Sequence, residues 1–142
     1  MTNRVTKQYN SPLGRDISGG IEMAKVRIKN MMFYGFHGLY EYEREQGQKF
    51  FIDIEIETKD DSAAAADDPV NAVQSATVYA VVRDNVENKR FMLLQALGHH
   101  VNLELLQAMP MAKSSTIVIR KPSVPIAGPL DCVEVEVHTD RE

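Results

Sequence analysis

The sequence predicts one α+β domain with the element order ββααββ, in which two helices cover one face of a four-stranded antiparallel sheet. Four segments predict the strands, because their apolar and polar residues alternate with the period of two of a half-buried strand. Two longer segments in the middle of the chain predict the helices, because their apolar residues recur at helical spacing. The chain has 142 residues, 44% of them hydrophobic, which suffices for one core without disulfide or metal support.

The first two strands are expected on either side of a loop. Residues 26–34 alternate apolar and charged residues, become continuously apolar, and stop at Gly35. Residues 36–47 are rich in Tyr and Glu and have no clean periodicity, so we expect a loop. Residues 50–57 alternate large apolar residues with acidic ones, which predicts the second strand and a long hairpin.

Two helices are expected in the middle of the chain. Residues 60–69 are acidic and rich in alanine, which indicates a connection with room for a short helical turn. Residues 76–86 carry valines at helical spacing, and the polar residues 88–90 end that helix. Residues 91–108 place one apolar face on a second helix, which Pro110 ends.

The last two strands are expected after the helices. Residues 116–119 form an apolar run that stops at Lys121-Pro122, and a proline-rich loop follows. Residues 132–138 alternate again, which predicts the fourth strand, with Cys132 facing the core. A single cysteine excludes a disulfide framework and fits a reducing compartment.

Composition excludes several function classes. A net charge of −4 argues against a nucleic-acid-binding protein. No apolar run approaches the roughly 18 residues of a membrane span, and no apolar segment near the N-terminus resembles a secretory signal. We therefore expect a cytoplasmic enzyme or binding domain. Residues 1–22 lack periodicity and are expected to form a flexible extension, or alternatively a partner-binding arm, so the domain spans residues 23–142.

The histidines give no metal site. His37 ends the first strand, where it could serve as an acid–base group or equally order the loop through a hydrogen bond. His99 and His100 are neighbours on the second helix and point about 100° apart, so they cannot both face one metal ion. We expect no metal.

Three short motifs extend this pattern. Residues 33–38 read Phe-Tyr-Gly-Phe-His-Gly and are followed by Glu43-Arg44-Glu45 and Gly47-Gln48-Lys49-Phe50. Residues 93–97 read Leu-Leu-Gln-Ala-Leu, and Lys121-Pro122 precedes Pro125 and Gly128. In this order and at these separations, the motifs resemble the dihydroneopterin aldolase family of the tunnelling-fold superfamily. The resemblance covers nearly everything from Met23 onward without gaps.

The resemblance implies an activity. Members of this family cleave 7,8-dihydroneopterin by a retro-aldol reaction to 6-hydroxymethyl-7,8-dihydropterin and glycolaldehyde, a step of folate biosynthesis, and epimerisation of the side chain is a related reaction. The pterin ring acts as the electron sink, so neither a metal nor another cofactor is implied. The family also implies a homo-oligomer, a tetramer or an octamer, that closes the sheet edges and places active sites between subunits.

The resemblance assigns roles to individual residues. Glu43 and Lys121 fall on the glutamate and lysine that handle the substrate hydroxyls and proton transfer. Ser75 replaces the family's tyrosine, since pairing Tyr79 with it needs an insertion and a deletion. Gln95 replaces the glutamate that anchors the pterin amino edge. The remaining residues assigned to substrate binding are Leu94, Val73 and Gln74.

Two substituted positions leave other functions open. A pterin presents two adjacent donors, and a carboxylate accepts both, whereas the Gln95 amide offers one acceptor and one donor. Gln95 therefore suits an N–H beside a carbonyl, as in a 2-oxo ring. The alternatives to the aldolase are a divergent paralogue that binds such a heterocycle, and a non-catalytic assembly module.

Overall fold

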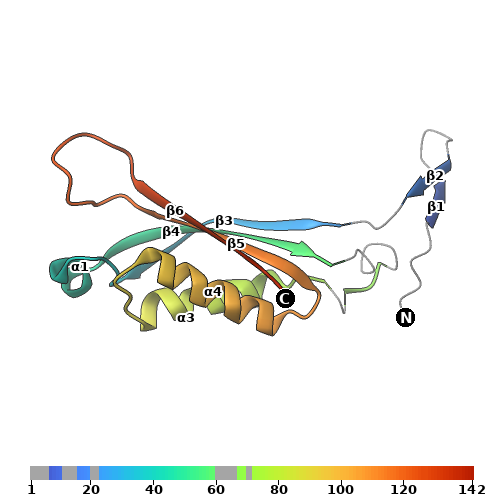
Figure 1. Ribbon diagram of the computed structural model, residues 1–142, viewed down its shortest axis with the longest axis horizontal. Coiled ribbons are helices and arrows are strands. Elements are labelled where there is room, and N and C mark those ends of the chain that lie inside the picture. The colour runs from blue at the N-terminus through green and yellow to red at the C-terminus, as the bar shows by residue number, and fades with distance from the viewer. Residues whose placement is uncertain (1–6, 11–15, 20–22, 60–66, 70–71) are drawn as a thin grey trace.

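The computed structural model describes residues 7–10, 16–19, 23–59, 67–69 and 72–142. Within these residues the domain is built on a four-stranded antiparallel sheet with the strand order β3-β4-β5-β6. The strands are β3 (Lys25–Gly35), β4 (Gln48–Thr58), β5 (Ala112–Lys121) and β6 (Val133–Asp140). Helices α3 (Ser75–Asn88) and α4 (Leu94–Ala108) cover one face of the sheet, as Figure 1 shows. The predicted α+β fold and its ββααββ order are confirmed.

The core lies between the sheet and the two helices. The alternation in β4 turns Phe50, Ile52, Ile54 and Ile56 toward the helices, where each is at most 1% exposed. From α4, Leu97, Val101 and Leu105 meet them and are fully buried. The residues between those of β4 are charged or aromatic and occupy the opposite face of the sheet. The helix-covered face is therefore apolar, and the open face is polar.

The loop expected over residues 36–47 contains a helix, α1 (Glu41–Gln46), so that part of the prediction is wrong. This helix has six residues and buries only Glu43, so it shows no apolar periodicity. Hydrogen bonds at its two ends stabilise this helix instead of apolar burial. The Glu43 carboxylate accepts a hydrogen bond from the Tyr40 amide at 3.2 Å, and the Gly47 amide donates to the Glu43 carbonyl at 3.0 Å.

Three boundaries also differ from the prediction. Helix α4 begins at Leu94 rather than at residue 91, and β5 is longer than residues 116–119. Cys132 lies outside β6 and is only partly buried, so its expected place in the core is wrong. The reason is register: the ladder between β5 and β6 begins with Lys121 opposite Val133, one residue after the cysteine.

The expected extension of residues 1–22 and the connection of residues 60–69 lie largely outside the described residues. Within the first stretch, β1 (Lys7–Asn10) and β2 (Asp16–Gly19) pair as an antiparallel hairpin that the sequence does not predict. Figure 1 shows this hairpin beyond one end of the sheet. Among the described residues, no helix is long and apolar enough to cross a membrane.

Candidate functional site

A buried ion pair lies at the end of the domain where α1, the end of β5 and the start of α4 come together (Figure 1). The Lys121 ammonium stands 2.7 Å from one carboxylate oxygen of Glu43. Their side chains are 12% and 3% exposed, respectively. These two residues are 78 positions apart in the sequence, and the fold joins two groups that can hold or transfer protons.

The backbone around Glu43 fixes its carboxylate. Glu43 lies in the first turn of α1, and the Tyr40 amide binds the carboxylate oxygen that Lys121 leaves free. Gly38 makes room for this arrangement, because a Cβ atom there would lie 2.6 Å from the carboxyl carbon of Glu43. The Arg44 guanidinium donates to the Gly38 and Leu39 carbonyls at 2.8 Å and secures the loop.

A second contact holds the turn after Lys121. The Gln48 side-chain amide donates to the Ser123 carbonyl at 2.8 Å and accepts from the Ser123 amide at 3.0 Å. Gln48 directly follows Gly47, which ends the helix that carries Glu43. One side chain therefore joins the segment of Glu43 to the turn of Lys121-Pro122. This contact was not predicted from the sequence, although Gln48 stands inside one of the motifs.

His37 is fully buried and links three segments. Its Nε2 lies 2.8 Å from the Val86 carbonyl, and the Phe91 amide donates to its Nδ1 at 3.1 Å. A ring that accepts at Nδ1 and meets a carbonyl at Nε2 is neutral, with its proton on Nε2. Burial lowers the pKa of His37 and favours the same neutral form. Of the two roles that the sequence left open, the geometry favours ordering of the loop.

The start of α4 lies at the same end of the domain as the ion pair. The Gly38 amide donates to the Phe91 carbonyl at 3.0 Å, so the loop before α1 contacts the turn before α4. Leu94 is 5% exposed and packs into the core, whereas Gln95 is exposed in the first turn of the helix. The Gln95 amide has no hydrogen-bond partner among the described residues.

The remaining predicted site residues lie at the opposite end of the domain. Ser75 begins α3, Val73 and Gln74 precede it, and Val86 near the helix's other end contacts His37. Because α3 has 14 residues, its two ends are about 20 Å apart. One chain therefore brings Glu43, Lys121, Leu94 and Gln95 to one end and leaves Val73, Gln74 and Ser75 at the other. Tyr79 is half exposed on α3 and contacts the Phe33 ring.

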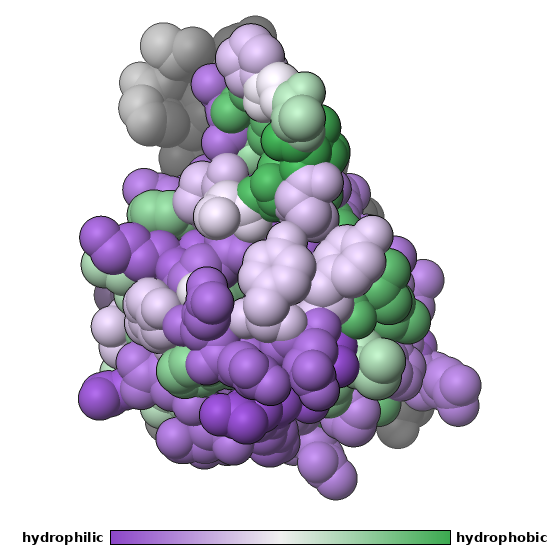
Figure 2. Space-filling model, turned by 90° about the vertical axis from the view of Figure 1, so that its left-hand side faces the viewer, coloured by the Kyte–Doolittle hydropathy of each residue, from purple (hydrophilic) through white to green (hydrophobic). Residues whose placement is uncertain are grey.

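The surface around the ion pair is rich in exposed apolar and aromatic side chains. Figure 2 views this end and shows hydrophobic residues gathered on the loop between β5 and β6, with aromatic and polar residues beneath them. The exposed large side chains of these segments are Leu39, Tyr40, Tyr42, Met92, Leu93, Ile126 and Leu130. Such a surface suits the face of a flat ring or contact with another chain.

No group of three or more potential ligands stands ready for a metal ion in the part of the chain that the structure describes. The neighbouring rings of His99 and His100 on α4 are 6.1 Å apart and nearly perpendicular. Both histidines are exposed on the helix surface.

The family model and the curated relatives that match this chain agree with each other. The family model described as dihydroneopterin aldolase matches residues 26–138. The dihydroneopterin aldolase of Streptococcus pyogenes serotype M18 is 29% identical over 119 residues, which is 84% of this chain and the whole of that protein. Among solved structures, a dihydroneopterin aldolase of Vibrio cholerae superimposes with a TM-score of 0.70 at 28% identity, covering 85% of this chain and all of that one. The Escherichia coli dihydroneopterin aldolase in complex with neopterin gives 0.68 at 28% identity, with 82% and 98% of the chains covered.

Proposed function

The chain belongs to the dihydroneopterin aldolase family, and from this premise we propose which of its residues carry the reaction. Its function is that of a dihydroneopterin aldolase-like lyase of folate biosynthesis. The reaction cleaves 7,8-dihydroneopterin into 6-hydroxymethyl-7,8-dihydropterin and glycolaldehyde. The buried pair of Glu43 and Lys121 supports our assignment most directly, because it places a carboxylate and an ammonium in contact at a sheltered end of the fold.

A retro-aldol cleavage has three chemical needs. A base removes the proton from a side-chain hydroxyl, the carbon–carbon bond breaks with its electrons entering the ring, and an acid returns a proton to the new carbanion. In our proposal, Lys121 serves both transfers after releasing its own proton to solvent: the free amine takes the hydroxyl proton, and the resulting ammonium gives a proton to the carbanion. Glu43 holds the substrate hydroxyls. Each Glu43 oxygen uses one lone pair on Lys121 or on the Tyr40 amide, so each can accept one more donor.

The other site residues come from a second chain in this proposal. Ser75, Val73 and Gln74 are about a helix length away from the ion pair within one chain, so a site that contains both groups needs two chains. We therefore propose a homo-oligomer, a tetramer or an octamer, with its sites between subunits. The Ser75 hydroxyl has no phenol ring to extend it, so it acts on the substrate through water.

The test is turnover of 7,8-dihydroneopterin by the pure protein, assayed for glycolaldehyde and for the side-chain epimer. Lys121→Ala is expected to lower turnover by at least about 10²-fold, the effect of losing an acid–base group. Lys113→Ala is the matched control, because Lys113 is an exposed lysine near the other end of β5. Full activity of Lys121→Ala would overturn the assignment, and no product from wild type would overturn the activity.

A second candidate function rests on Gln95. Its amide is exposed and has no hydrogen-bond partner within the described residues, and it matches a ring N–H beside a carbonyl better than two adjacent donors. A 2-oxo heterocycle is therefore the alternative ligand. Calorimetry with a pterin and its 2-oxo counterpart distinguishes the two, with Gln95→Glu as the paired variant. If wild type prefers the 2-oxo ring by about tenfold or more, a 1.4 kcal/mol effect, and Gln95→Glu reverses the order, the alternative holds. A wild type that prefers the 2-amino ring refutes it.

A further inference from the structure

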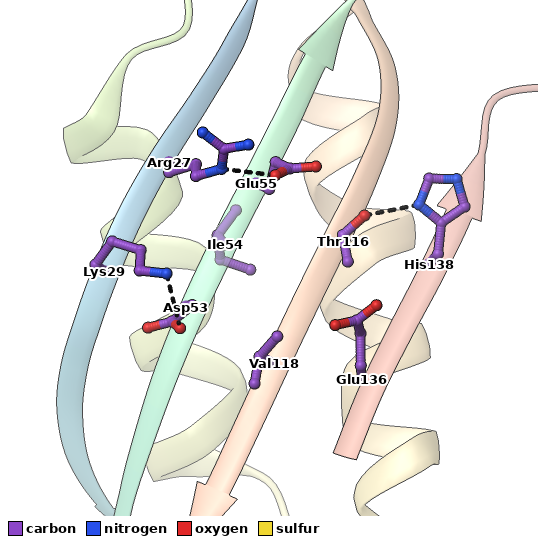
Figure 3. A pocket seen from close by; sticks show the side chains of 9 residues that line it. All are labelled: Arg27, Lys29, Asp53, Ile54, Glu55, Thr116, Val118, Glu136 and His138. Atoms are coloured by element: carbon purple, nitrogen blue, oxygen red, sulfur yellow. Dashed lines mark hydrogen bonds and ion pairs between the residues drawn. The ribbon is translucent and has the colours of Figure 1, made fainter. Parts of the chain in front are cut away.

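The open face of the sheet carries a hollow that the proposed lyase reaction does not use. Figure 3 shows its side chains on strands β3 to β6, on the face away from the helices. Its volume is about 390 Å³, within the roughly 300–1,000 Å³ of small-molecule pockets. Its lining includes Arg27, Glu55, Thr116, Val118, Glu136 and His138. Neither Glu43 nor Lys121 lines it, so any chemistry in this hollow needs groups of its own.

The sheet register brings a hydroxyl, an imidazole and a carboxylate into contact beside this hollow. Thr116 of β5 lies opposite His138 of β6, and the Thr116 hydroxyl oxygen lies 2.7 Å from Nδ1 of the His138 ring (Figure 3). Nε2 of the same ring lies 2.9 Å from a carboxylate oxygen of Asp140. Asp140 is two residues further along β6, so its side chain shares a face of the sheet with His138. The three groups therefore form one chain of hydrogen bonds.

These contacts determine which ring nitrogen of His138 carries the proton. An ionised carboxylate can only accept, so the neutral ring keeps its proton on Nε2 and donates it to Asp140. Nδ1 is then an acceptor, and the Thr116 hydroxyl donates to it. A hydroxyl that faces a base, with a carboxylate orienting that base, is the arrangement that activates a hydroxyl as a nucleophile.

The surroundings of Thr116 indicate the class of substrate. Glu55 lies opposite Thr116 on β4, and Glu136 lies on β6 opposite Val118. Because like charges repel, these acids disfavour an anionic substrate. Val118 is two residues along β5 from Thr116 and is half-buried on the same face, where it offers an apolar surface to a small acyl group. The His138 base is half exposed to water, so an ester, which breaks more readily than an amide, is the class that it suits.

A positive charge stands on the other side of the hollow. The register places Arg27, Glu55, Thr116 and His138 in one row across the four strands. The Arg27 guanidinium donates through Nε to Glu55 at 2.7 Å, and its terminal N–H groups have no partner among the described residues. An ester bound between Arg27 and Thr116 would turn its carbonyl oxygen toward these N–H groups, which stabilise the oxyanion of a tetrahedral intermediate.

We propose that Thr116 and His138, with Asp140 orienting the His138 ring, form a second catalytic site that hydrolyses small uncharged esters. The Thr116 oxygen attacks the carbonyl carbon while its proton passes to Nδ1 of His138, and the bond to the alcohol then breaks as the alcohol takes that proton. Water attacks the acyl-threonine in the same way, and the proton returns to the Thr116 oxygen as the carboxylic acid leaves. This activity goes beyond the proposed lyase reaction and uses none of its residues.

The test uses the full-length protein and p-nitrophenyl acetate. Wild type is expected to release p-nitrophenolate with an initial burst, and mass spectrometry of the digested protein is expected to find the acetyl group on Thr116. His138→Gln is expected to lower turnover by about 10²-fold, the low end for a general base, because the ring is half exposed. Thr116→Val keeps the branched side chain without the hydroxyl, and it is expected to abolish the burst. Asp140→Asn is expected to lower kcat and leave KM unchanged, because Asp140 acts through His138 and does not touch the substrate.

The matched control is His99→Gln, because an isolated imidazole can also attack this ester. His99 is an exposed histidine on α4, so its variant is expected to keep both the burst and the turnover of wild type. Circular dichroism checks that each variant is folded. If Thr116→Val or His138→Gln turns over the ester as wild type does, or if the acetyl group is found only on other residues, the proposal is overturned.

Discussion

Removing Lys121 alone from the ion pair is expected to destabilise the fold more than removing both partners. Lys121→Met keeps most of the hydrocarbon chain and removes the charge, which leaves the Glu43 carboxylate only 3% exposed with no cation beside it. Glu43→Gln leaves the Lys121 ammonium, which is 12% exposed and can still reach water. The double variant leaves no buried charge, because both groups are then neutral.

The expected sizes follow from this burial. Breaking a buried pair by removing one partner costs about 3–5 kcal/mol. Lys121→Met is expected near the low end, about 3 kcal/mol, because the Tyr40 amide still donates a hydrogen bond to the stranded Glu43 carboxylate. Glu43→Gln is expected to cost about 1–2 kcal/mol, because its stranded ammonium is better hydrated. The double variant is expected to cost no more than about 2 kcal/mol. The coupling energy of the cycle is then about 2–3 kcal/mol.

The assay is urea unfolding of the four proteins at pH 7 and one fixed protein concentration, because assembly makes stability depend on concentration. Turnover is measured on the same preparations. We expect all three variants to lose activity and the double variant to regain stability relative to Lys121→Met. This pattern separates loss of chemistry from loss of fold. Free energies that add to within about 0.5 kcal/mol would refute the buried ion pair.

Three further predictions concern pH and packing. The pKa of His37 is lowered by burial, so the unfolded chain binds the proton more readily than the folded one. The free energy of unfolding, measured in urea, should therefore fall as the pH drops below about 6.5, and it should fall less in His37→Asn. The pKa of Asp53 is lowered chiefly by its hydrogen bond from Arg120, so this carboxylate stabilises the fold above about pH 4, and the stabilisation is lost below it. In Asp53→Asn, the free energy of unfolding should therefore fall less steeply at acid pH than in wild type. Gly98→Ala would place its Cβ 2.9 Å from side chains of Ile117 and Val137, at a cost of about 1–3 kcal/mol, whereas Gly128→Ala meets nothing within 4 Å and should be neutral.

Periodicity alone predicted the elements that bury many residues. The alternation of β4 and the apolar face of α4 each repeat several times, so the periodicity can be recognised in the sequence. Helix α1 buries one residue, Glu43, and its stability comes from hydrogen bonds at its two ends. Such a helix leaves only an end signal, here the glutamate in the first turn and Gly47 after the last, and the sequence analysis did not use it.

The sequence analysis named the residues of the proposed site but could not show their arrangement. The motif resemblance named Glu43 and Lys121, but only the fold shows that two residues 78 positions apart form one buried pair. The contact of Gln48 with Ser123 spans 75 positions and is made to the Ser123 backbone, so no pattern of side chains in the sequence predicts it. The spacing of residues in a sequence predicts which side chains share one face of a helix or strand. Contacts between two elements depend also on the sheet register.

The distance between the two groups of predicted site residues limits what Ser75 can do within its own chain. Helix α3 is a continuous helix, so it holds Ser75 about 20 Å from the end that contacts His37, whatever side chain stands at position 75. No rotamer of Ser75, or of a tyrosine in its place, spans that distance to Lys121 of the same chain. Any effect of Ser75 on the chemistry at Lys121 must therefore come from a neighbouring chain of the proposed oligomer.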